Sequence, residues 1–426
     1  MQTRCDMLTR KLFLPFKSIW RLVMLRKMAL RAITTAGVLL AFVALPLLGQ
    51  GIERKEYTGL DKYPTQGRQD ASSSVGVRAA EFLTIPVGAR GIGMGGACSA
   101  VLDDISAIWW NPAGLGLMDQ REVMLTVVDY TLDLSYSYAA FATPIADNVM
   151  TIGVFAGYLD VPDEEITTIT NPNGTGSFYN AFDFQMGVSF AYNLSDRFVA
   201  GMNVKYIHQD FFQNIAGNAF GIDAGAIYHT ELADREIRFS FAIQNLGTNI
   251  TMKGETLRIG VGPEALGGGV PDGYGDYSTD PFAIATRSDR DAFRATHTYR
   301  LPTTVKIALA YNLYTGEAAN WLASAEVWRN SNIPISYTVG TELNYNFTPF
   351  LSGAFRTGWM IQTDEFTASQ DALGYDYLGE DPTWRGLSFG GGIKQIFGSR
   401  AVSFNYAYQN KGRLTADNFF SLQFGF

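Results

Sequence analysis

The stretch Ile333–Phe347, IPISYTVGTELNYNF, alternates between two kinds of side chain along its length. One set is apolar or aromatic and includes Tyr337 and Leu343, while the other is small, polar or charged and includes Thr338 and Glu342. Successive side chains of a β-strand point to opposite faces. The period of two therefore predicts a strand with one apolar and one polar face.

The same alternation recurs from Glu122 to the last residue, Phe426, and it divides the chain into separate runs. Fourteen runs are predicted as strands, near residues 122–129, 135–144, 148–159, 182–193, 197–209, 219–230, 236–245, 303–314, 321–329, 333–347, 350–362, 386–397, 401–410 and 417–426. An even number of antiparallel strands returns the chain to its starting side, as a single-chain transmembrane barrel requires. The sequence thus predicts an all-β fold, a 14-stranded antiparallel transmembrane β-barrel.

The connections between these runs are of two lengths. Short turns rich in Asn, Asp, Gly and Pro alternate with long polar connections at 160–181, 246–302 and 363–385. Short turns on one side and long loops on the other are typical of the periplasmic and extracellular ends of outer-membrane barrels. The chain also ends in an alternating strand whose last residue is the aromatic Phe426.

Composition distinguishes this barrel from a water-soluble β-sandwich, which also alternates. Aromatic residues make up 13% of the chain, and charged residues only 17%, against about 25% in an average soluble protein. The outer faces of a soluble sandwich meet water and carry many Lys and Glu. Here one face of each run is apolar, so we expect outer-membrane lipid around the barrel.

The first 50 residues form a basic segment followed by the apolar run Ala32–Leu48, which predicts a cleaved signal peptide and export to the bacterial outer membrane. The alternative is a membrane-anchor helix, although 17 apolar residues are at the short limit for spanning. Residues 51–78 are polar and without pattern, and are predicted to be a flexible tether. Without the leader the chain carries 25 Lys and Arg against 40 Asp and Glu, which argues against nucleic acid as a partner.

Residues 79–118, between the tether and the barrel at 119–426, are predicted to be an N-terminal plug, or hatch, in the lumen. Their core, Phe82–Leu117, is dense in glycine, which lets a backbone fold closely on itself. A short helix is expected from about Asp103, as its N-cap, to Trp110. The candidate plug residues are Gly88, Arg90, Gly93, Met94, Gly95, Gly96, Asp103, Asp104, Asn111, Pro112 and Gly114.

The run Gly91–Gly96 also satisfies the G-x-G-x-x-G pattern of dinucleotide-binding loops. That fingerprint requires a strand, a crossover helix and a second strand around it, and the runs that follow here contain no crossover helices. We therefore expect close-packed plug backbone at this position, and no cofactor.

Several charges fall on the polar faces of the predicted strands and so should face the lumen. They are Asp183, Lys205, Asp223, Arg238, Lys306, Glu342, Arg356 and Lys394. A charge in a packed lumen needs a partner, so we expect these residues to pair with one another and with Arg90, Asp103 and Asp104 of the plug. The alternative is a polar permeation path, and either reading argues against a continuous apolar channel.

Enzymatic activity is not expected. The chain has three histidines, His208, His229 and His297, no G-x-S-x-G motif and no metal-ligand spacing. Cys98 is the one cysteine after the leader and is predicted to be a packing residue. The long loop at 246–302 is the candidate docking surface for a partner, since long loops on rigid scaffolds often bind.

The plug sequences FLTIPVGARGIGMGGA and LDDISAIWWNPAGL, with FAIQNLG at Phe241–Gly247, resemble the PorV/PorQ outer-membrane family, relatives of the FadL-type channels. The resemblance implies a fourteen-stranded barrel with a hatch in its lumen. It also implies one of two functions, of which an accessory role in type IX secretion is expected here and uptake of hydrophobic compounds is the alternative. PorV-type members act beside the type IX secretion translocon and receive secreted cargo domains. FadL-type members take up long-chain fatty acids or other hydrophobic small molecules.

Overall fold

The computed structural model describes residues 78–130, 133–211, 215–254, 257–261, 290–293, 296, 298–331, 335–362, 384–412 and 416–426. The predicted signal peptide and nearly all of the predicted tether lie outside these residues. So does the greater part of the connections at 246–302 and 363–385. The predictions made for them stay predictions.

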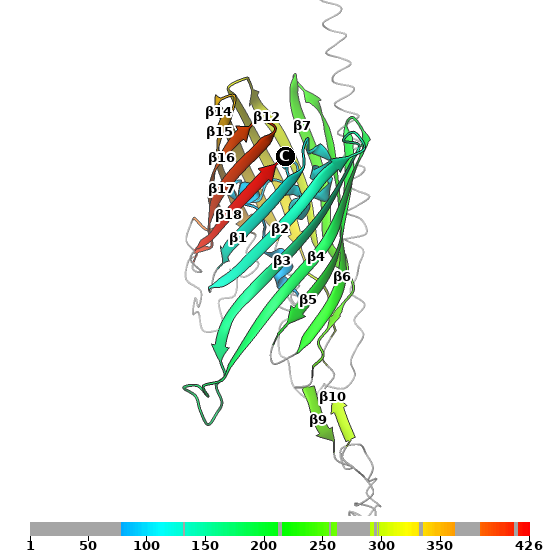
Figure 1. Cartoon of the computed structure of the whole chain (residues 1–426), viewed down its shortest axis with the longest axis vertical. Coiled ribbons are helices and arrows are strands. Elements are labelled where there is room, and N and C mark those ends of the chain that lie inside the picture. Colours follow the sequence, from blue (N-terminus) through cyan, green and yellow to red (C-terminus); the bar gives the residue numbers. More distant parts are fainter. Residues whose placement is uncertain are drawn as a thin grey trace, which may run out of the picture. The chain divides into compact units, whose positions relative to one another are not determined.

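Among the described residues, fourteen long strands form a closed antiparallel barrel, which confirms the predicted fold class (Figure 1). The strands are β1 (Glu122–Tyr130), β2 (Leu134–Ile145), β3 (Met150–Glu165), β4 (Phe178–Ser195), β5 (Phe198–Asp210), β6 (Ala216–Leu232), β7 (Arg235–Gly247), β12 (Thr304–Thr315), β13 (Ala319–Asn330), β14 (Ser336–Thr348), β15 (Leu351–Gln362), β16 (Leu387–Phe397), β17 (Arg400–Asn410) and β18 (Ala416–Gly425). Strand β7 pairs with β12, and β18 closes the barrel on β1.

The turns between β2 and β3, β4 and β5, β6 and β7, β12 and β13, β14 and β15, and β16 and β17 lie at one end of the barrel, called here the short-turn end, together with the start of β1 and the end of β18. The β6–β7 turn shows how they are made, because Ala233 and Asp234 have φ of 54° and 59°. Two consecutive positive φ values twist a hairpin in the same sense as its strands. The opposite end, called the long-loop end, carries the long connections.

The hairpin of β3 and β4 is longer than the alternation predicts. Strand β3 was expected to end at residue 159 and β4 to begin at 182, but pairing continues to Glu165 and Phe178 across a register shift near Pro162. The extension is exposed on both faces from Pro162 to Glu165. Residues beyond the apolar belt meet water on both sides, so their sequence carries no alternation.

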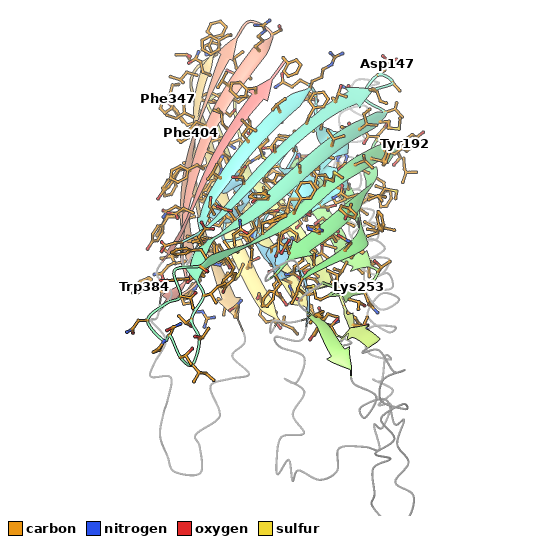
Figure 2. All side chains as sticks on the ribbon, turned by 60° about the horizontal axis from the view of Figure 1, so that its bottom comes forward. Asp147, Tyr192, Lys253, Phe347, Trp384 and Phe404 are labelled. Carbon is orange, nitrogen blue, oxygen red and sulfur yellow. The ribbon has the colours of Figure 1, made fainter. Side chains whose placement is uncertain are left out.

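The outer face of the barrel is a belt of large apolar side chains (Figure 2). Examples from strands around the circumference are Leu125, Val154, Phe190 and Phe355, which are 48%, 50%, 44% and 57% exposed. Phe347, at the short-turn end, is 62% exposed. A continuous apolar outer surface of this kind requires lipid around it, and the fold is therefore that of a transmembrane barrel.

The connection at 246–302 contains short strands that the sequence analysis did not predict. They are β8 (Ile250–Thr251), β9 (Arg258–Val261), β10 (Arg290–Phe293) and β11 (Thr298–Tyr299), paired as β8 with β11 and β9 with β10. Among the described residues, no helix is both long and apolar enough to cross a lipid bilayer.

The predicted plug, residues 79–118, is called the plug segment. It contains four short helices, η1 (Glu81–Thr84), α3 (Ala89–Gly93), α4 (Ala107–Trp110) and η2 (Pro112–Leu117). Helix α3 contacts β15 to β18, while η2 contacts β3 to β6. The segment therefore touches opposite parts of the inner wall.

The helix expected from Asp103 to Trp110 is shorter than predicted, and its capping residue was wrongly assigned. Helix α4 begins at Ala107. Asp104, rather than Asp103, accepts hydrogen bonds from the backbone and the hydroxyl of Ser106. Asp103 instead points to Arg90. The helix ends before Asn111 as expected, because a residue preceding proline leaves the helical region.

Candidate functional site

Glycines of the barrel wall lie against the backbone of the plug segment. Gly340 of β14 pairs with Gly358 of β15, and both face Met94. A Cβ atom built on Gly358 would lie 2.1 Å from the carbonyl carbon of Met94, and one on Gly340 would lie 2.2 Å from its oxygen. Such contacts are far inside van der Waals distance, so the two backbones can meet only because both wall positions are glycine.

The glycines of the plug segment serve the same close approach. A Cβ on Gly93 would lie 3.0 Å from the Cα of Gly390 in β16. Gly95 has a φ of 67° and would place a Cβ 2.6 Å from the backbone nitrogen of Trp359. The run Gly91–Gly96 is therefore close-packed backbone against the wall.

The part of the plug segment from Asn111 to Gly114 meets glycines on the opposite wall. The Oδ1 atom of Asn111 accepts a hydrogen bond of 3.1 Å from the Ala113 backbone, and the Asn111 side chain forms the N-cap of η2. A Cβ on Gly225 of β6 would lie 1.9 Å from that oxygen, and one on Gly201 of β5 2.4 Å from the Ala113 nitrogen. The plug segment is thus held between two glycine-lined strips.

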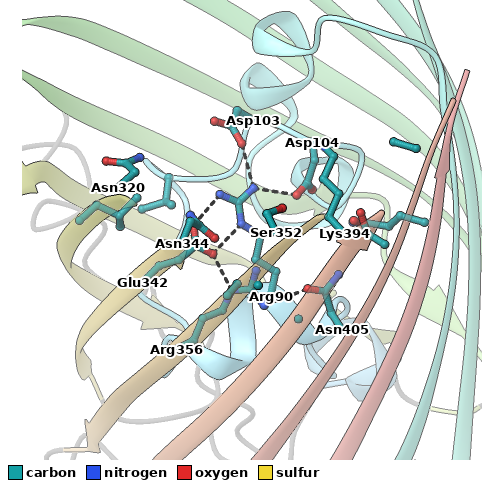
Figure 3. A pocket seen from close by; sticks show the side chains of 18 of the residues that line it. Arg90, Asp103, Asp104, Asn320, Glu342, Asn344, Ser352, Arg356, Lys394 and Asn405 are labelled. Carbon is teal, nitrogen blue, oxygen red and sulfur yellow. Dashed lines mark hydrogen bonds and ion pairs between the residues drawn. The ribbon is translucent and has the colours of Figure 1, made fainter. Parts of the chain in front are cut away.

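Arg90 of the plug segment is the centre of a charged cluster (Figure 3). Its guanidinium donates to Asp103 at 2.8 Å and to Asp104 at 2.7 Å, within the plug segment. It also donates to both carboxylate oxygens of Glu342 on β14, at 2.9 and 2.8 Å. Glu342 accepts in turn from Arg356 of β15 at 2.5 Å. The structure therefore brings together five of the charges chosen from the sequence.

The charges of the cluster stabilise the ionised form of Asp103. Burial acts to raise the pKa of the Asp103 carboxyl, but the charges of Arg90 and Arg238 outweigh burial and hold the pKa below its usual value. The carboxylates of Glu342, Asp103 and Asp104 likewise outweigh burial at Arg90 and raise the pKa of its guanidinium. Arg90 and Asp103 therefore stay charged near neutral pH.

A polar cavity of about 330 Å³ borders this cluster. Its other lining residues include Lys394, Glu122, Ser352 and Asn320, all within a few positions of a short turn or of the start of β1. The cavity therefore lies in the short-turn half of the lumen.

Lys306 on β12 is enclosed by aromatic rings. Its ammonium lies 4.3 Å from the ring centroid of Trp109, 4.6 Å from that of Trp110 and 4.5 Å from that of Trp328. The residue is 1% exposed, and its Nζ atom has no hydrogen-bond partner. Two of the three indoles belong to the plug segment, so cation–π attraction joins the plug segment to the wall at this point.

Glu326 of β13 is a functional candidate that the sequence analysis missed. Its carboxylate accepts from the backbone nitrogens of Cys98 and Ser99 at 2.9 Å and from the Ser99 hydroxyl at 2.7 Å. Cys98 is buried, and burial, reinforced by the charge of Glu326, raises the pKa of its thiol. The thiol is therefore an unreactive packing group, in agreement with its predicted role.

Other inward side chains bind the backbone of the plug segment in the same way. Ser421 accepts from the Ala89 nitrogen, and Glu122 accepts from that of Ile105, each at 2.9 Å. Wall amides that donate to backbone carbonyls of the plug segment belong to Asn193, Asn203 and Gln244. The signal that could have found these residues is their position on the inward face of a strand. The sequence predictions used that position for charged residues only.

Among the remaining predicted charges, Lys205, Asp223 and Arg238 have oppositely charged partners as expected. The expected charge pairing is wrong for Asp183, Lys306 and Lys394, which form no ion pair with a described residue. Lys205 of β5 lies 2.9 Å from Asp223 of β6, and it donates to Asn245 at 2.5 Å. Asp183 accepts from Gln209 at 3.2 Å. Arg238 lies 3.7 Å from Asp103. Lys394 borders the polar cavity without joining the Arg90 cluster.

Part of the long-loop half of the lumen is apolar, which corrects the expectation of a polar inner face along every strand. Tyr136 and Tyr138 of β2 and Phe155 and Leu159 of β3 point inward and are at most 7% exposed. They share one core cluster with Phe82 of the plug segment. We call these four wall residues the apolar patch.

The histidines show no catalytic arrangement. His208 hydrogen-bonds to Asn218 at 2.6 Å, and His229 lies 3.8 Å from Glu236. His297 lies outside the described residues. Within the described part of the chain, no group of three or more His, Cys, Asp or Glu residues is placed to hold a metal ion.

The lowered pKa of Asp103 leads to a prediction about acid. A carboxylate with a depressed pKa contributes stability above its ordinary pKa of about 3.9 and loses it as the pH falls through the lowered value. If the plug segment closes the lumen, the ion conductance of the full chain in planar bilayers should stay at its closed level from about pH 8 to about pH 5 and rise only in stronger acid. A rise within that neutral range would contradict the assignment. The Asp103→Asn variant should show a weaker dependence on acid.

Comparisons with known proteins give solved structures of low similarity. No protein-family model matches the sequence, and no curated protein matches it. The toluene transporter TodX of Pseudomonas putida has 10% sequence identity and a TM-score of 0.49, with 79% of this chain and 96% of TodX covered. The FadL homologue of Pseudomonas aeruginosa has 14% identity and a TM-score of 0.41, with 80% and 98% covered.

A third structure, the toluene transporter TbuX of Ralstonia pickettii, has 12% identity and a TM-score of 0.44, with 79% of this chain and 97% of TbuX covered. Similarity at this level carries no argument about function. The PorV/PorQ part of the sequence resemblance is not tested by these structures and stays a prediction. Support for the function of this chain comes from its own residues.

Proposed function

We propose that this chain is a gated channel of the bacterial outer membrane that takes up small hydrophobic compounds, and that the plug segment is its gate. The channel is the lumen of the fourteen-stranded barrel. The plug segment contacts the inner wall on opposite sides, which supports its assignment as the part that closes the lumen. In this proposal a solute passes when the plug segment shifts.

The observation that carries this proposal is the apolar patch in the long-loop half. Tyr136, Tyr138, Phe155 and Leu159 present an aromatic and aliphatic surface inside the lumen, where a pore for ions or sugars needs polar groups. Tyr138 stacks on Phe155 with ring centroids 5.9 Å apart. Such a surface offers binding energy to a hydrocarbon or an acyl chain and none to a hydrophilic solute.

The contacts that hold the plug segment are partly polar. Beside the apolar packing they include hydrogen bonds and ion pairs from the wall, such as those of Glu342, Glu326 and Ser421. Water can replace polar contacts of this kind when the lumen hydrates, whereas apolar contacts give up their burial energy without replacement. The polar contacts are therefore the part of the interface that favours movement of the gate.

The type IX secretion role, with a translocon and cargo domains as partners, rests on the sequence resemblance. It was assigned to the long loops, and the greater part of those loops lies outside the described residues. Normal secretion with impaired hydrocarbon uptake in a deletion strain would separate the two functions in favour of the channel. Impaired secretion with normal hydrocarbon uptake would instead favour the secretion role.

The lining gives a sharper test through Phe155. The Phe155→Asp variant places an unpaired carboxylate in the apolar patch. We expect this change to slow the uptake of a radiolabelled long-chain fatty acid or of toluene by about tenfold, equivalent to about 1.4 kcal/mol. Phe155→Leu is the matched control and should stay within about twofold of the unmodified chain. The amount of protein in the outer membrane is measured for each strain. Equal uptake by the Asp variant and the unmodified chain would contradict the proposal.

A further inference from the structure

The outer face of the barrel has a hollow in its apolar belt, over strands β14 to β17. Its volume is about 530 Å³. Phe347 and Tyr345 of β14 line one side, and Phe404 and Tyr406 of β17 line the other. Phe347 and Phe404 are labelled on this flank in Figure 2. We call this hollow the outer groove.

The groove exists because two outward positions lack side chains. Gly353 of β15 pairs with Ile393 of β16, and Gly391 of β16 pairs with Phe355 of β15, so the two glycines occupy adjoining levels of the outer face. A Cβ built on Gly391 would meet only the Ala354 oxygen within 4 Å, at 3.8 Å. At Gly391 the floor of the groove is therefore bare backbone with open space above it, whereas the ring of Phe347 covers Gly353 and would lie 2.7 Å from a Cβ built there.

The groove lies in the belt that faces lipid, which limits what can fill it. Its lining consists of aromatic and aliphatic side chains and backbone, with the tyrosine hydroxyls as the only polar side-chain groups among its lining residues. An empty hollow in this surface would lose dispersion contacts along its whole length. A flexible hydrocarbon chain from the surrounding bilayer fits the chemistry of this lining.

A basic residue lies where the head group of such a lipid would be. Arg400 begins β17 and has the same strand parity as Phe404, so it shares the outward face, at the short-turn end. It is exposed. A guanidinium at the membrane interface attracts a phosphate. We propose that the outer groove binds one acyl chain of a phospholipid from the leaflet at the short-turn end, with its phosphate beside Arg400.

The outer groove lies over a thin part of the barrel wall. Gly353, Ala354, Gly392 and Ile393 border the outer groove and also the polar cavity inside the lumen. Only a single layer of strand backbone separates the two hollows here. The bound acyl chain covers this thin part of the wall and keeps apolar contact on its outer side.

Photo-crosslinking tests this proposal. The full chain is placed in vesicles of phosphatidylethanolamine and phosphatidylglycerol that contain a phospholipid with a diazirine on its acyl chain, and the labelled peptides are identified by mass spectrometry. We expect labelling to concentrate on 343–355 and 391–406 and to fall severalfold in Gly391→Leu, which fills the groove. Val204→Leu, an outward change on β5, is the control and should leave that labelling unchanged.

Two outcomes would overturn the proposal. One is labelling spread evenly over the strands or unchanged in Gly391→Leu. The other is a dimer of the unmodified chain that dissociates in Gly391→Leu, because the groove would then hold a second copy of the chain. Closed-level conductance and unaltered electrophoretic mobility of the folded form show that the variant barrel is intact.

Discussion

Replacement of Gly358 by valine should leave the barrel folded and open it to ions. The Cβ atom at this position would lie 2.1 Å from the carbonyl carbon of Met94 and 2.4 Å from the nitrogen of Gly95. The neighbouring atoms are backbone on both sides, and they cannot rotate away as a side chain would. The plug segment must therefore leave the wall, while valine itself suits a strand.

The comparison is made by conductance in planar bilayers. We expect Gly358→Val to conduct continuously, where the unmodified chain conducts rarely. Gly391→Val is the matched control, since it adds the same side chain to the adjacent strand on the outward face, where only one atom lies within 4 Å. This control should stay closed. A closed Gly358→Val barrel would show that the contact with Met94 does not hold the gate.

Removal of the Glu342 carboxylate should have the second-largest effect. Glu342 is fully buried and is shared by Arg90, whose side chain is 14% exposed, and Arg356, whose side chain is 5% exposed. In Glu342→Ala both guanidinium groups lose this partner in a place that water barely reaches. Breaking a buried ion pair on one side costs about 3–5 kcal/mol. The ratio of open to closed time should therefore rise by at least about a hundredfold.

A double-mutant cycle separates the ion pair from other effects of this change. Combining Glu342→Ala with Arg90→Met removes the charge that Glu342 had neutralised, so the double variant should be less open than the sum of the two single variants predicts. The Glu342→Gln variant keeps the shape of the side chain and one acceptor oxygen. Its ratio of open to closed time should lie between those of the unmodified chain and Glu342→Ala. Additive effects would mean that Arg90 and Glu342 do not act as a pair in closing the lumen.

The barrel could be predicted from the sequence because apolar and polar side chains alternate along a strand that has lipid on one side and the lumen on the other. All fourteen predicted runs are strands, and the run that contains Tyr337 and Glu342 is β14. The extension of β3 to Glu165 escaped prediction because that part of the hairpin is exposed on both faces. Alternation depends on having two different environments, and water on both sides removes it.

The charged partners were predictable and the rest of the site was not. A buried charge requires an opposite charge. This rule pointed to Glu342 on the inward face of a strand and to Arg90 and Asp103 in the plug segment. The wall glycines Gly340 and Gly358 gave no such signal, since their role depends on which backbone lies across the lumen. The apolar residues Tyr136 and Phe155 also look like outward residues in sequence, and only the register of β2 and β3 turns them inward.

The central claim is that residues 82–117 close an otherwise open barrel. The most direct test is the single-channel conductance of the chain that lacks these residues, beside that of the full chain, in the same planar bilayer. We expect the shortened chain to form a permanently open pore and the full chain to remain closed. A shortened chain that folds into a barrel and stays closed would contradict the claim, because the loops at the long-loop end would then be the seal.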